Sequence, residues 1–517
     1  MRISGALVAA GLAIGIALRI WVLLSSQGAL DADEAVWGLM ARHILHGQLP
    51  TFFWGQTYGG TQETFVTAAL FWIFGASTTA LRVTPIFCWA AATVLLWRVA
   101  RRLLGEQQAR FAAALFWMSP VFFVWKSTRA HGFYGAGLVF GLWSILAALR
   151  LRERVSVRDL ASLGLALGLG WWATPEIAIL GLPAVAWLVW TKPAVLRGAP
   201  VAAVAFLLGG LPWWLYNIRH DWPSLHAHNG GGGSSALGHL HNLASSTLPT
   251  ALGLRLPFSL SWLPDIEIGV ALYALALGGF IWLLVRRPPG LVLPLLAAVV
   301  FPILYAASPY ASLESEPRYL TLLVPVFALL AAYTAGSPPR ALAVFLGAGA
   351  FSIAGLALMD ARNLAAQRVG GVALPADFHP LLSTLEEHHA SRVWATYWVA
   401  YRVTFESDER IVAAEPGSSR YEIHNGRVVP TGEAEIGTQG RHADYQLEVA
   451  ASRDVAHVFA AGENEARARP LLQRAGYVLV RTDGFDVWFP PRKAATAVSA
   501  NNATSSRSRA STTQTID

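Results

Sequence analysis

The sequence predicts a mostly α-helical, polytopic membrane protein with a small α/β segment near its C-terminal end. Of its 517 residues, 54% are hydrophobic and only 14% are charged, whereas a soluble domain carries about 25% charged residues. Apolar runs of roughly 17–25 residues recur, which is the length needed to cross the hydrocarbon of a bilayer. Basic residues gather in every second loop between these runs, as they do in multi-pass proteins.

The apolar runs predict about eleven transmembrane helices, and up to about thirteen, because an interfacial helix can mimic a span. They lie near residues 3–24, 81–99, 111–125, 132–149, 160–173, 177–190, 201–216, 268–285, 291–306, 319–335 and 342–359. The first run follows a basic start and lacks a clear small-residue cleavage site. We therefore expect it to be a retained signal-anchor.

The distribution of Lys and Arg predicts the orientation of the bundle in the cell (plasma or inner) membrane. By the positive-inside rule, the basic loops and the N-terminus face the cytoplasm, and an odd number of spans then places the segment after Met359 outside. The net charge of +7 is therefore a topology signal, and no nucleic-acid partner is expected. The basic loops contain Arg98, Arg101, Arg102 and Arg110; Arg150, Arg152, Arg154 and Arg158; Lys192 and Arg197; Arg286 and Arg287; and Arg340.

Three parts of the chain are expected: a transmembrane domain over residues 1–360, a small extracytoplasmic α/β domain over 375–492, and a disordered tail over 493–517. In the second part, "FHPLLSTLEEHHA" and "NEARARPLLQRA" have helical periodicity, whereas "RVWATYW", "VAHVFAA" and "GYVLVRT" are strand-like. The tail is rich in Ser, Thr and Ala and has no periodic apolar face.

The first outer loop, residues 27–79, carries the most unusual motif. It opens with "DADEAVWGLMARHILHG", which places three carboxylates within four residues. An amphipathic helix is predicted over residues 35–46, with Gly47 ending it, and Glu63 lies near the start of a second short helix. About fifty residues are too many for a connector, and the many Trp and Tyr side chains favour the membrane surface.

These carboxylates allow two interpretations. An Asp before a helix is a favoured N-cap, and a Glu in the first turn gains from the helix dipole. Capping explains Asp31 best. For the pair Asp33–Glu34, a capping role and a catalytic role both stay open, because one helix cap uses only one carboxylate. Glu63 is likewise open to a first-turn role.

The order of motifs resembles that of the C-type glycosyltransferases, and is similar to bacterial aminoarabinose transferases and protein O-mannosyltransferases. The motifs are "DE" opening an amphipathic helix, "GQTYGGTQE", "FGASTTALRV", a span ending in "RVARRLLG", "LPWWLYNIRHDWPSL" and "EPRYLTLLVPVFALL". The resemblance covers about residues 1–359. It implies a hexosyl- or pentosyltransferase that moves a sugar from a polyprenyl-phosphate donor to an envelope glycan, lipid or protein.

The resemblance also implies roles for the acids of the first outer loop. Asp33 would be the general base and Glu34 its neighbour, and Glu63 would take the place of the acid that begins the second loop helix. The aminoarabinose transferases follow that acid with Lys-Pro, whereas this chain continues "ETF". The identity of the donor sugar is therefore not carried over.

A glycosyltransferase with such a base also needs a cation near it. Glycosyl transfer from a lipid phosphate needs a base for the acceptor hydroxyl and positive charge for the departing phosphate. Arg binds phosphate with a planar fork of donors. Arg318, at the mouth of a span in "EPRYL", is the first candidate, and Lys126 and Arg129 in "WKSTRAHGFY" come next. Snorkelling or pairing with the outer acids is the alternative for each.

Substrate contacts are expected from residues of the quoted motifs and from one acid at the outer end of a span. These residues are Tyr58, Glu176, Asn217 and Tyr319. A divalent cation on Asp33, Glu34 or Glu63, with His131 or His43 as a further ligand, is left open because no metal-spacing motif supports it.

Two other functions stay open. A transporter of lipid-linked sugars would also be polytopic, but transporters usually show two related halves and broken helices, and no internal repeat is evident. A lipid-diphosphate-dependent glycan ligase would share the lipid donor but release a diphosphate. Dependence on a polyprenyl-monophosphate sugar separates the three functions.

Overall fold

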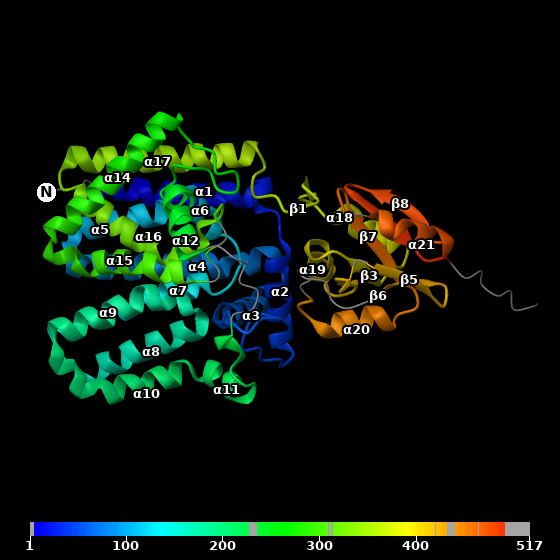
Figure 1. The fold of residues 1–517 in the computed structure, drawn as a ribbon, viewed down its shortest axis with the longest axis horizontal. Coiled ribbons are helices and arrows are strands. Elements are labelled where there is room, and N and C mark those ends of the chain that lie inside the picture. The colour runs from blue at the N-terminus through cyan, green and yellow to red at the C-terminus, as the bar shows by residue number, and fades with distance from the viewer. Residues whose placement is uncertain are drawn as a thin grey trace, which may run out of the picture.

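The computed structural model describes residues 5–226, 235–308, 311, 314–418, 420–431, 440–463 and 465–491. A helical bundle occupies one end of the molecule and an α/β region the other, with the N-terminus at the end of the bundle away from the α/β region (Figure 1). The predicted fold class, a mostly α polytopic bundle with a small C-terminal α/β part, is confirmed.

Most bundle helices are long and apolar. Seven helices of the described chain are long and apolar enough to cross a membrane, or eight if the bent pair Pro175–Thr191 and Pro193–Gly209 forms one span. The seven are α1 (Gly5–Leu24), α4 (Thr78–Leu104), α7 (Tyr134–Glu153), α14 (Ile266–Arg286), Pro289–Ala307 with α15 (Val292–Ala307), Pro317–Thr334 with η7 (Pro317–Leu323) and α16 (Val324–Thr334), and α17 (Pro338–Ala361).

Every apolar run that the sequence indicated is helical, although the count of about eleven spans is not established. The remaining runs form shorter helices: α5 (Glu106–Met118), α6 (Val121–Lys126), α8 (Val157–Ala173), α9 (Ala178–Thr191), α10 (Ala199–Gly209) and α11 (Leu211–Arg219). Pro120 separates α5 from α6, because proline has no backbone N–H to continue the helical ladder. Two shorter helices, α12 (Ala236–Asn242) and α13 (Leu248–Ala251), lie between α11 and α14.

Small residues set the closest packing in the bundle. A Cβ added at Gly164 would lie 2.0 Å from the carbonyl oxygen of Ala202, and one at Gly168 would lie 2.2 Å from that of Phe206. These glycines let the backbones of α8 and α10 approach, as small residues do where helices pack in membranes.

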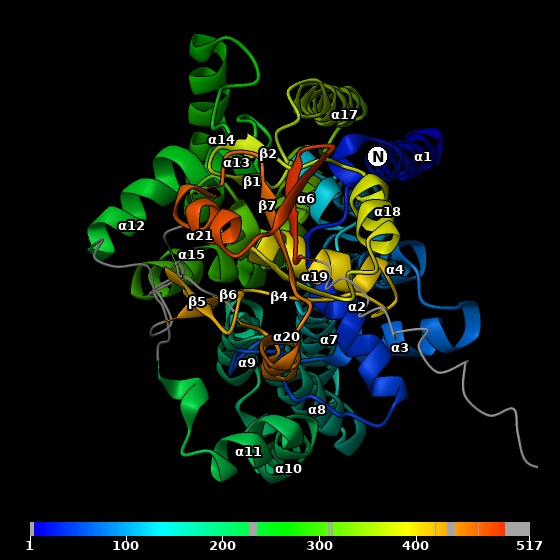
Figure 2. The same ribbon diagram turned by 90° about the vertical axis from the view of Figure 1, so that its right-hand side faces the viewer.

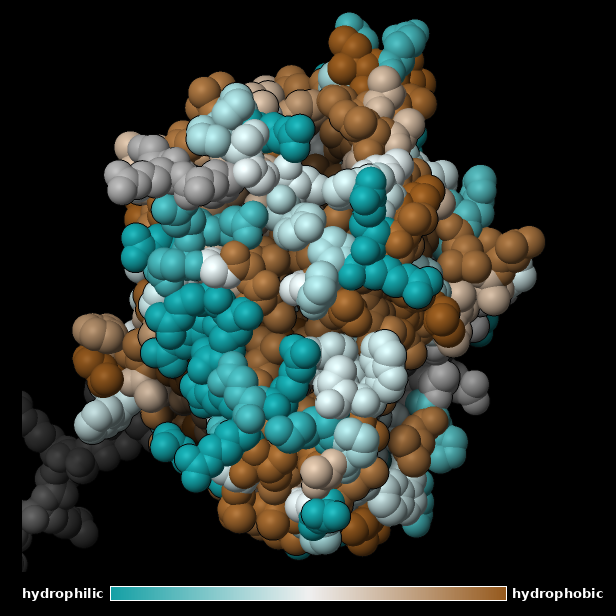
Figure 3. Space-filling view, turned by 90° about the vertical axis from the view of Figure 1, so that its left-hand side faces the viewer, coloured by the Kyte–Doolittle hydropathy of each residue, from teal (hydrophilic) through white to brown (hydrophobic). Residues whose placement is uncertain are grey.

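The end of the bundle away from the α/β region carries a hydrophilic band between apolar surfaces (Figure 3). Helices α4 and α7 finish with arginines in their last turn, and α1 begins at this end (Figure 1). The basic loops therefore lie at the opposite end from the first-loop carboxylates. This arrangement agrees with the expected orientation, which stays a prediction.

The C-terminal region is built around a five-stranded sheet of order β4-β3-β7-β9-β8. Strand β3 (Arg392–Ala395) is parallel to β4 (Val412–Ala414) and β7 (Ala456–Ala460), whereas β9 (Phe485–Phe489) is antiparallel to β7 and β8 (Val478–Thr482). The helices are α18 (His379–Glu387), α19 (Tyr397–Glu406), α20 (Ala443–Ala451) and α21 (Arg469–Arg474). Two small antiparallel pairs are β1 (Arg368–Val369) with β2 (Val372–Ala373), and β5 (Arg420–His424) with β6 (Arg427–Thr431).

Four of the five C-terminal segments form the predicted kind of element, and one was wrong in part. In "RVWATYW" the strand ends at Ala395, and Tyr397 begins α19. A short apolar run fits a buried strand and a buried helix equally well, and this run contains both. The tail predicted over 493–517 lies outside the described residues, and the domain boundaries stay predictions.

The first loop and the C-terminal region share one hydrophobic cluster. Helix α2 (Ala32–Leu45) packs against α19, and α3 (Gln62–Phe74) follows α2 in the same layer; Figures 1 and 2 both show α19 beside α2. The cluster joins Trp37 and Phe53 of the first loop to Tyr401 and Phe405 of α19. A Cβ at Gly38 would lie 2.4 Å from the Phe405 ring. The opening carboxylates therefore lie at a tightly packed interface.

Candidate functional site

Asp31 is the N-cap of α2. Its Oδ1 accepts a hydrogen bond from the backbone N–H of Glu34 at 2.9 Å, which explains why α2 begins three residues earlier than predicted. Its Oδ2 lies 2.8 Å from Nη2 of Arg129 and 2.7 Å from Nε2 of His131. Burial raises the pKa of Asp31, but His131 and Arg129 outweigh burial and hold it well below its usual value. The capping interpretation of Asp31 is confirmed.

Glu34 is fully buried between two arginines. Its Oε1 accepts from Nε of Arg82 and from the backbone N–H of Ala130, each at 3.0 Å. Its Oε2 lies 2.8 Å from Nη2 of Arg82 and 2.6 Å from Nη2 of Arg129. Four donors thus occupy the carboxylate, which is the pattern of a buried charge satisfied by the protein itself.

Asp33 differs from both neighbours. It is half-buried in the first turn of α2, whose other residues are buried, and the one hydrogen bond to its side chain from the described residues comes from the Tyr397 hydroxyl of α19 to Oδ1. It interacts electrostatically with Lys126, Arg318 and Arg441. Of the three carboxylates, Asp33 is the one left available for chemistry.

Lys126, at the end of α6, is buried beside His131. Its Nζ lies 2.8 Å from Nδ1 of His131 and 4.4 Å from the ring centroid of Tyr134. Burial, followed by the charge of Arg318, lowers the pKa of Lys126 to about 8. His131 therefore links Lys126 to Asp31 and fixes the direction of the ammonium group.

Arg129 is committed to the carboxylates. Its Nη1 donates to the backbone oxygen of Ala29 at 2.7 Å, and its Nη2 serves both Asp31 and Glu34. The alternative of pairing with the outer acids, raised for Arg129 from the sequence, is what the geometry favours. A phosphate would have to compete with two buried carboxylates for this side chain.

Arg318 is placed for a ligand. It lies in η7, its Nε is buried without a hydrogen-bond partner among the described residues, and its nearest carboxylate, Glu316, is 3.9 Å away. It interacts electrostatically with Lys126, Tyr134 and Asp33. A buried donor without a partner calls for an explanation, and an anion bound between Arg318 and Lys126 supplies one.

Two of the predicted substrate-binding residues, Glu176 and Tyr319, interact with Arg318, and Tyr58 interacts with Tyr319. Glu176 interacts with Arg318 and Lys126, and its Oε2 is buried without a partner among the described residues. Tyr319 interacts with Arg318, Glu176 and Tyr58. We call Asp33, Lys126, Arg318, Glu176, Tyr58, Tyr319 and Tyr134 the candidate site.

Asn217 has a structural position. Its Nδ2 donates to the backbone oxygen of Trp213 at 2.9 Å, and its Oδ1 accepts from the backbone N–H of Ser224 at 3.0 Å. The Ser224 hydroxyl in turn donates to the backbone oxygen of Thr57, the residue before Tyr58. Asn217 therefore supports the loop that carries Tyr58.

Glu63, at the start of α3, is buried and accepts from the backbone N–H of Ala136 at 2.8 Å. Burial raises its pKa to about 6, although the Ala136 N–H and the charge of Lys126 lower it. Glu63 therefore lies behind the candidate site, within the electrostatic reach of Lys126.

Sequence reasoning missed Tyr134 of the candidate site and two residues that interact with Asp33 from outside it. Tyr134, the last residue of "HGFY", begins the span of α7, and Tyr397 and Arg441 come from the C-terminal region. The aromatic character of Tyr134 at a span mouth was a usable signal, whereas no local signal marked the other two.

No group of three or more His, Cys, Asp or Glu residues suited to a metal ion occurs in the part of the chain that the structure describes. A cation on the first-loop acids stays a prediction.

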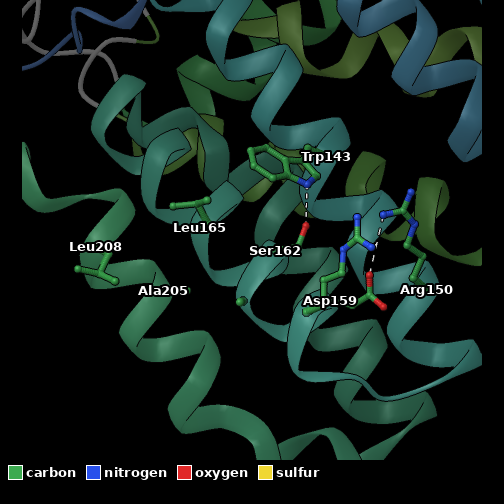
Figure 4. A pocket seen from close by; sticks show the side chains of 9 residues that line it. Trp143, Arg150, Asp159, Ser162, Leu165, Ala205 and Leu208 are labelled. Carbon is green, nitrogen blue, oxygen red and sulfur yellow. Dashed lines mark hydrogen bonds and ion pairs between the residues drawn. The ribbon is translucent and has the colours of Figure 1, made fainter.

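A cavity of about 510 Å³ lies elsewhere, between α7, α8 and α10 (Figure 4). Apolar side chains line it together with Trp143, Arg150 and Asp159. The charged groups of Arg150 and Asp159 are 3.9 Å apart. Arg150 is separated from Tyr134 by roughly 24 Å along α7, at 1.5 Å per residue. This cavity is therefore distinct from the candidate site.

Comparisons with known proteins agree with the motif resemblance. A family model described as dolichyl-phosphate-mannose-protein mannosyltransferase matches residues 63–216, a range that includes Lys126 but not Asp33. ArnT from Cupriavidus metallidurans in the apo state matches with a TM-score of 0.63 and 12% identity, over 93% of this chain and 97% of that chain. The same protein bound to undecaprenyl phosphate matches with a TM-score of 0.62 and 12% identity, over the same shares.

An oligosaccharyltransferase from Archaeoglobus fulgidus matches more weakly, with a TM-score of 0.48 and 13% identity over 88% of this chain and 69% of that chain. No curated protein matches the chain by sequence. The chain thus has the fold of ArnT, and the predicted resemblance to C-type glycosyltransferases is confirmed.

Proposed function

We propose that this protein is a glycosyltransferase that takes a hexose or pentose from a polyprenyl-phosphate donor and transfers it to a hydroxyl of an envelope glycan, lipid or protein. The observation that carries the proposal is the state of Asp33, a half-buried carboxylate that accepts one hydrogen bond in the described chain and interacts electrostatically with Lys126 and Arg318. The ArnT fold, which in one solved structure binds undecaprenyl phosphate, supports a lipid-phosphate donor.

Lys126 and Arg318 are suited to the donor phosphate. Arg318 offers a charged donor fork whose Nε has no hydrogen-bond partner in the described chain and whose ion pair with Glu316 is long, at 3.9 Å. Lys126 offers a point charge held by His131. In a buried site such cations stabilise the negative charge that grows on a departing phosphate. Arg129 belongs to the carboxylate network behind them.

Asp33 acts as the general base. It accepts the proton of the acceptor hydroxyl while the hydroxyl oxygen bonds to the anomeric carbon of the donor sugar. The bond from that carbon to the phosphate oxygen breaks, and the electron pair leaves with the polyprenyl phosphate. Positioned general bases contribute typically about 10²–10⁴-fold to a rate.

Glu176, Tyr58, Tyr319 and Tyr134 provide the polar and aromatic surface on which the sugar would rest. Hydroxyl and carboxylate groups bind sugar hydroxyls, and aromatic faces cover its apolar side. The unpartnered Oε2 of Glu176 is suited to a donor hydroxyl of the sugar.

The proposed reaction would take place on the extracytoplasmic face. The basic loops lie at the opposite end of the bundle from Asp33, and the positive-inside rule assigns that opposite end to the cytoplasm. Donor and acceptor would meet at the outer surface of the membrane.

Deletion of the gene tests the proposal. We expect one polyprenyl-phosphate sugar to accumulate in the lipids of the deletion strain as one envelope sugar disappears. Wild-type protein should discharge that lipid, and the Asp33→Asn variant should do so about 10²–10⁴-fold more slowly. Asp444→Asn, which neutralises an exposed carboxylate in the first turn of α20, is the matched control and should behave as wild type.

The alternatives give different outcomes. A transporter of lipid-linked sugars would move the accumulated lipid without consuming it, and a ligase would leave a polyprenyl diphosphate. Either result, or an Asp33→Asn protein with wild-type turnover, would refute the proposal.

A further inference from the structure

The C-terminal region contacts the candidate site through the side chain of Tyr397. Tyr397 is the first residue of α19, which lies beside α2 in Figures 1 and 2. Only 4% of Tyr397 is exposed, and its hydroxyl donates to Oδ1 of Asp33. The two residues are 364 positions apart in the chain.

Arg441 holds the other side of the same hydroxyl. Its Nε lies 3.3 Å from the Tyr397 oxygen, and its guanidinium carbon lies 5.5 Å from the Tyr397 ring centroid and 4.9 Å from that of Phe53. Its backbone N–H donates to the Tyr401 hydroxyl at 2.6 Å. Arg441 is thus anchored by α19 and by the first loop together.

The direction of this chain of hydrogen bonds is fixed by chemistry. An Arg side chain only donates, a phenol has one proton to give, and an ionised carboxylate only accepts. The phenol proton must therefore point from Tyr397 to Asp33. Burial and the charge of Asp33 raise the pKa of Tyr397 well above its usual value, so the proton stays in place at neutral pH.

We propose that Tyr397, oriented by Arg441, is a positioning residue for Asp33, so that the C-terminal region completes the candidate site. The inference rests on the proposed function, in which Asp33 is the base. Tyr397 holds Oδ1 and leaves Oδ2 to accept the proton of the acceptor. It touches neither donor nor acceptor, and it acts on the rate through the orientation of one carboxylate.

The same interface offers a matched control. The Tyr445 hydroxyl, on α20, lies 2.9 Å from Oε2 of Glu409 and 3.1 Å from Nε2 of His43 on α2. It is a buried phenol at the contact between the same two parts of the chain, and it makes no contact with Asp33. Loss of this hydroxyl reports what an interface hydrogen bond contributes to folding alone.

The experiment compares purified Tyr397→Phe, Tyr445→Phe, Arg441→Gln, Asp33→Asn and the double variant Asp33→Asn/Tyr397→Phe. The probe is the polyprenyl-phosphate sugar that accumulates in the deletion strain, and binding of undecaprenyl phosphate is measured beside turnover. We expect Tyr397→Phe to lower kcat by roughly 10- to 100-fold, the effect of one hydrogen bond to a charged group. The KM for the donor and the affinity for undecaprenyl phosphate should not change.

Three further results are expected. Tyr445→Phe turns over at the wild-type rate. Arg441→Gln lowers kcat in the same sense as Tyr397→Phe and provides the test if the latter is not recovered as folded protein. The double variant is no slower than Asp33→Asn alone, because a residue that acts through Asp33 has nothing to position once the base is gone.

The contrary results separate the inference from the proposed function. If wild type discharges the donor while Tyr397→Phe or Arg441→Gln matches Tyr445→Phe, the inference is overturned and the function stands. A double variant in which the two losses multiply would overturn it too, since Tyr397 would then act independently of Asp33. If wild type discharges no polyprenyl-phosphate sugar, the function fails and the inference fails with it.

Discussion

Replacing Glu34 with Gln separates structure from chemistry in the opening motif. The amide keeps the shape of the side chain but removes the negative charge that Arg82 and Arg129 share. Arg129 keeps Asp31, whereas Arg82 loses its one directly bonded carboxylate in the described chain. Removing one partner of a buried ion pair costs about 3–5 kcal/mol, because the other charge stays buried without compensation.

The adjacent residue provides the comparison. Asp33→Asn removes the same charge one position earlier on the same helix, but Asp33 is half-buried, and an Asn oxygen still accepts from the Tyr397 hydroxyl. Its cost in stability should stay near 1 kcal/mol, the net value of an ordinary hydrogen bond. We therefore expect Glu34→Gln to lose much stability, and Asp33→Asn to lose activity while it keeps its stability.

Thermal unfolding of detergent-solubilised protein, followed by tryptophan fluorescence, measures the first effect. Burial opposes the ionisation of Glu34, but Arg129 and Arg82 outweigh it and lower its pKa. The ionised Glu34 therefore contributes fully to stability above its ordinary pKa of 4.5. This contribution is lost as the pH falls through the lower pKa that Glu34 has in the folded protein. The gap between wild type and Glu34→Gln should narrow in acid. A Glu34→Gln protein as stable as wild type but inactive would refute this assignment.

Four other outcomes follow from the structure. Burial raises the pKa of Glu63 to about 6, so its charged form destabilises the folded protein above that pH. The free energy of unfolding of Glu63→Gln, measured by thermal unfolding, should therefore exceed that of wild type by up to about 2 kcal/mol above pH 6 and should equal it below pH 4.5. Burial lowers the pKa of His43, but its hydrogen bond to Glu409 outweighs burial and raises it. Hydrogen exchange at the contact of α2 with the C-terminal region should therefore become faster as the pH rises above 6.5, because His43 loses its charge. Glu409→Gln should abolish that pH dependence. Arg318→Lys should bind undecaprenyl phosphate more weakly than wild type, and Arg318→Ala more weakly still, because Lys keeps the charge but loses the fork; unchanged affinity in both would place the phosphate elsewhere. A phosphatase fused after Met359 should be active, as only an exported phosphatase is; activity of a cytoplasm-dependent reporter there would contradict the orientation.

Local features of the chain were readable from the sequence. Apolar length predicted the helices of the bundle, and the preference of Asp for N-caps predicted the role of Asp31. The charge requirement of phosphate transfer, together with the resemblance, selected Arg318 and Lys126, which the structure brings beside Asp33. Each of these inferences needed only nearby residues or the side of the membrane on which a residue lies.

Long-range pairing was not readable. Arg82 lies inside an apolar run, yet it binds Glu34, 48 positions away. Nothing near Asp33 indicated that Tyr397 would reach it across 364 positions. In both cases the partner is fixed by how α2 packs between the bundle and α19, which is a property of the tertiary fold and not of any short segment.

The charges around α2 explain why three carboxylates stand together at its start. Two arginines, Arg82 and Arg129, bind Asp31 and Glu34 at ion-pair distances, so two negative charges are balanced inside the protein and the third remains. That third charge, on Asp33, interacts electrostatically with Lys126 and accepts a hydrogen bond from the neutral phenol of Tyr397, which orients the carboxylate without adding a charge of its own. A carboxylate paired with arginine is a weaker base, because the ion pair favours its ionised form. The buried pairs therefore stabilise the start of the helix and neutralise two of its three charges, whereas Asp33 makes no such ion pair in the described chain.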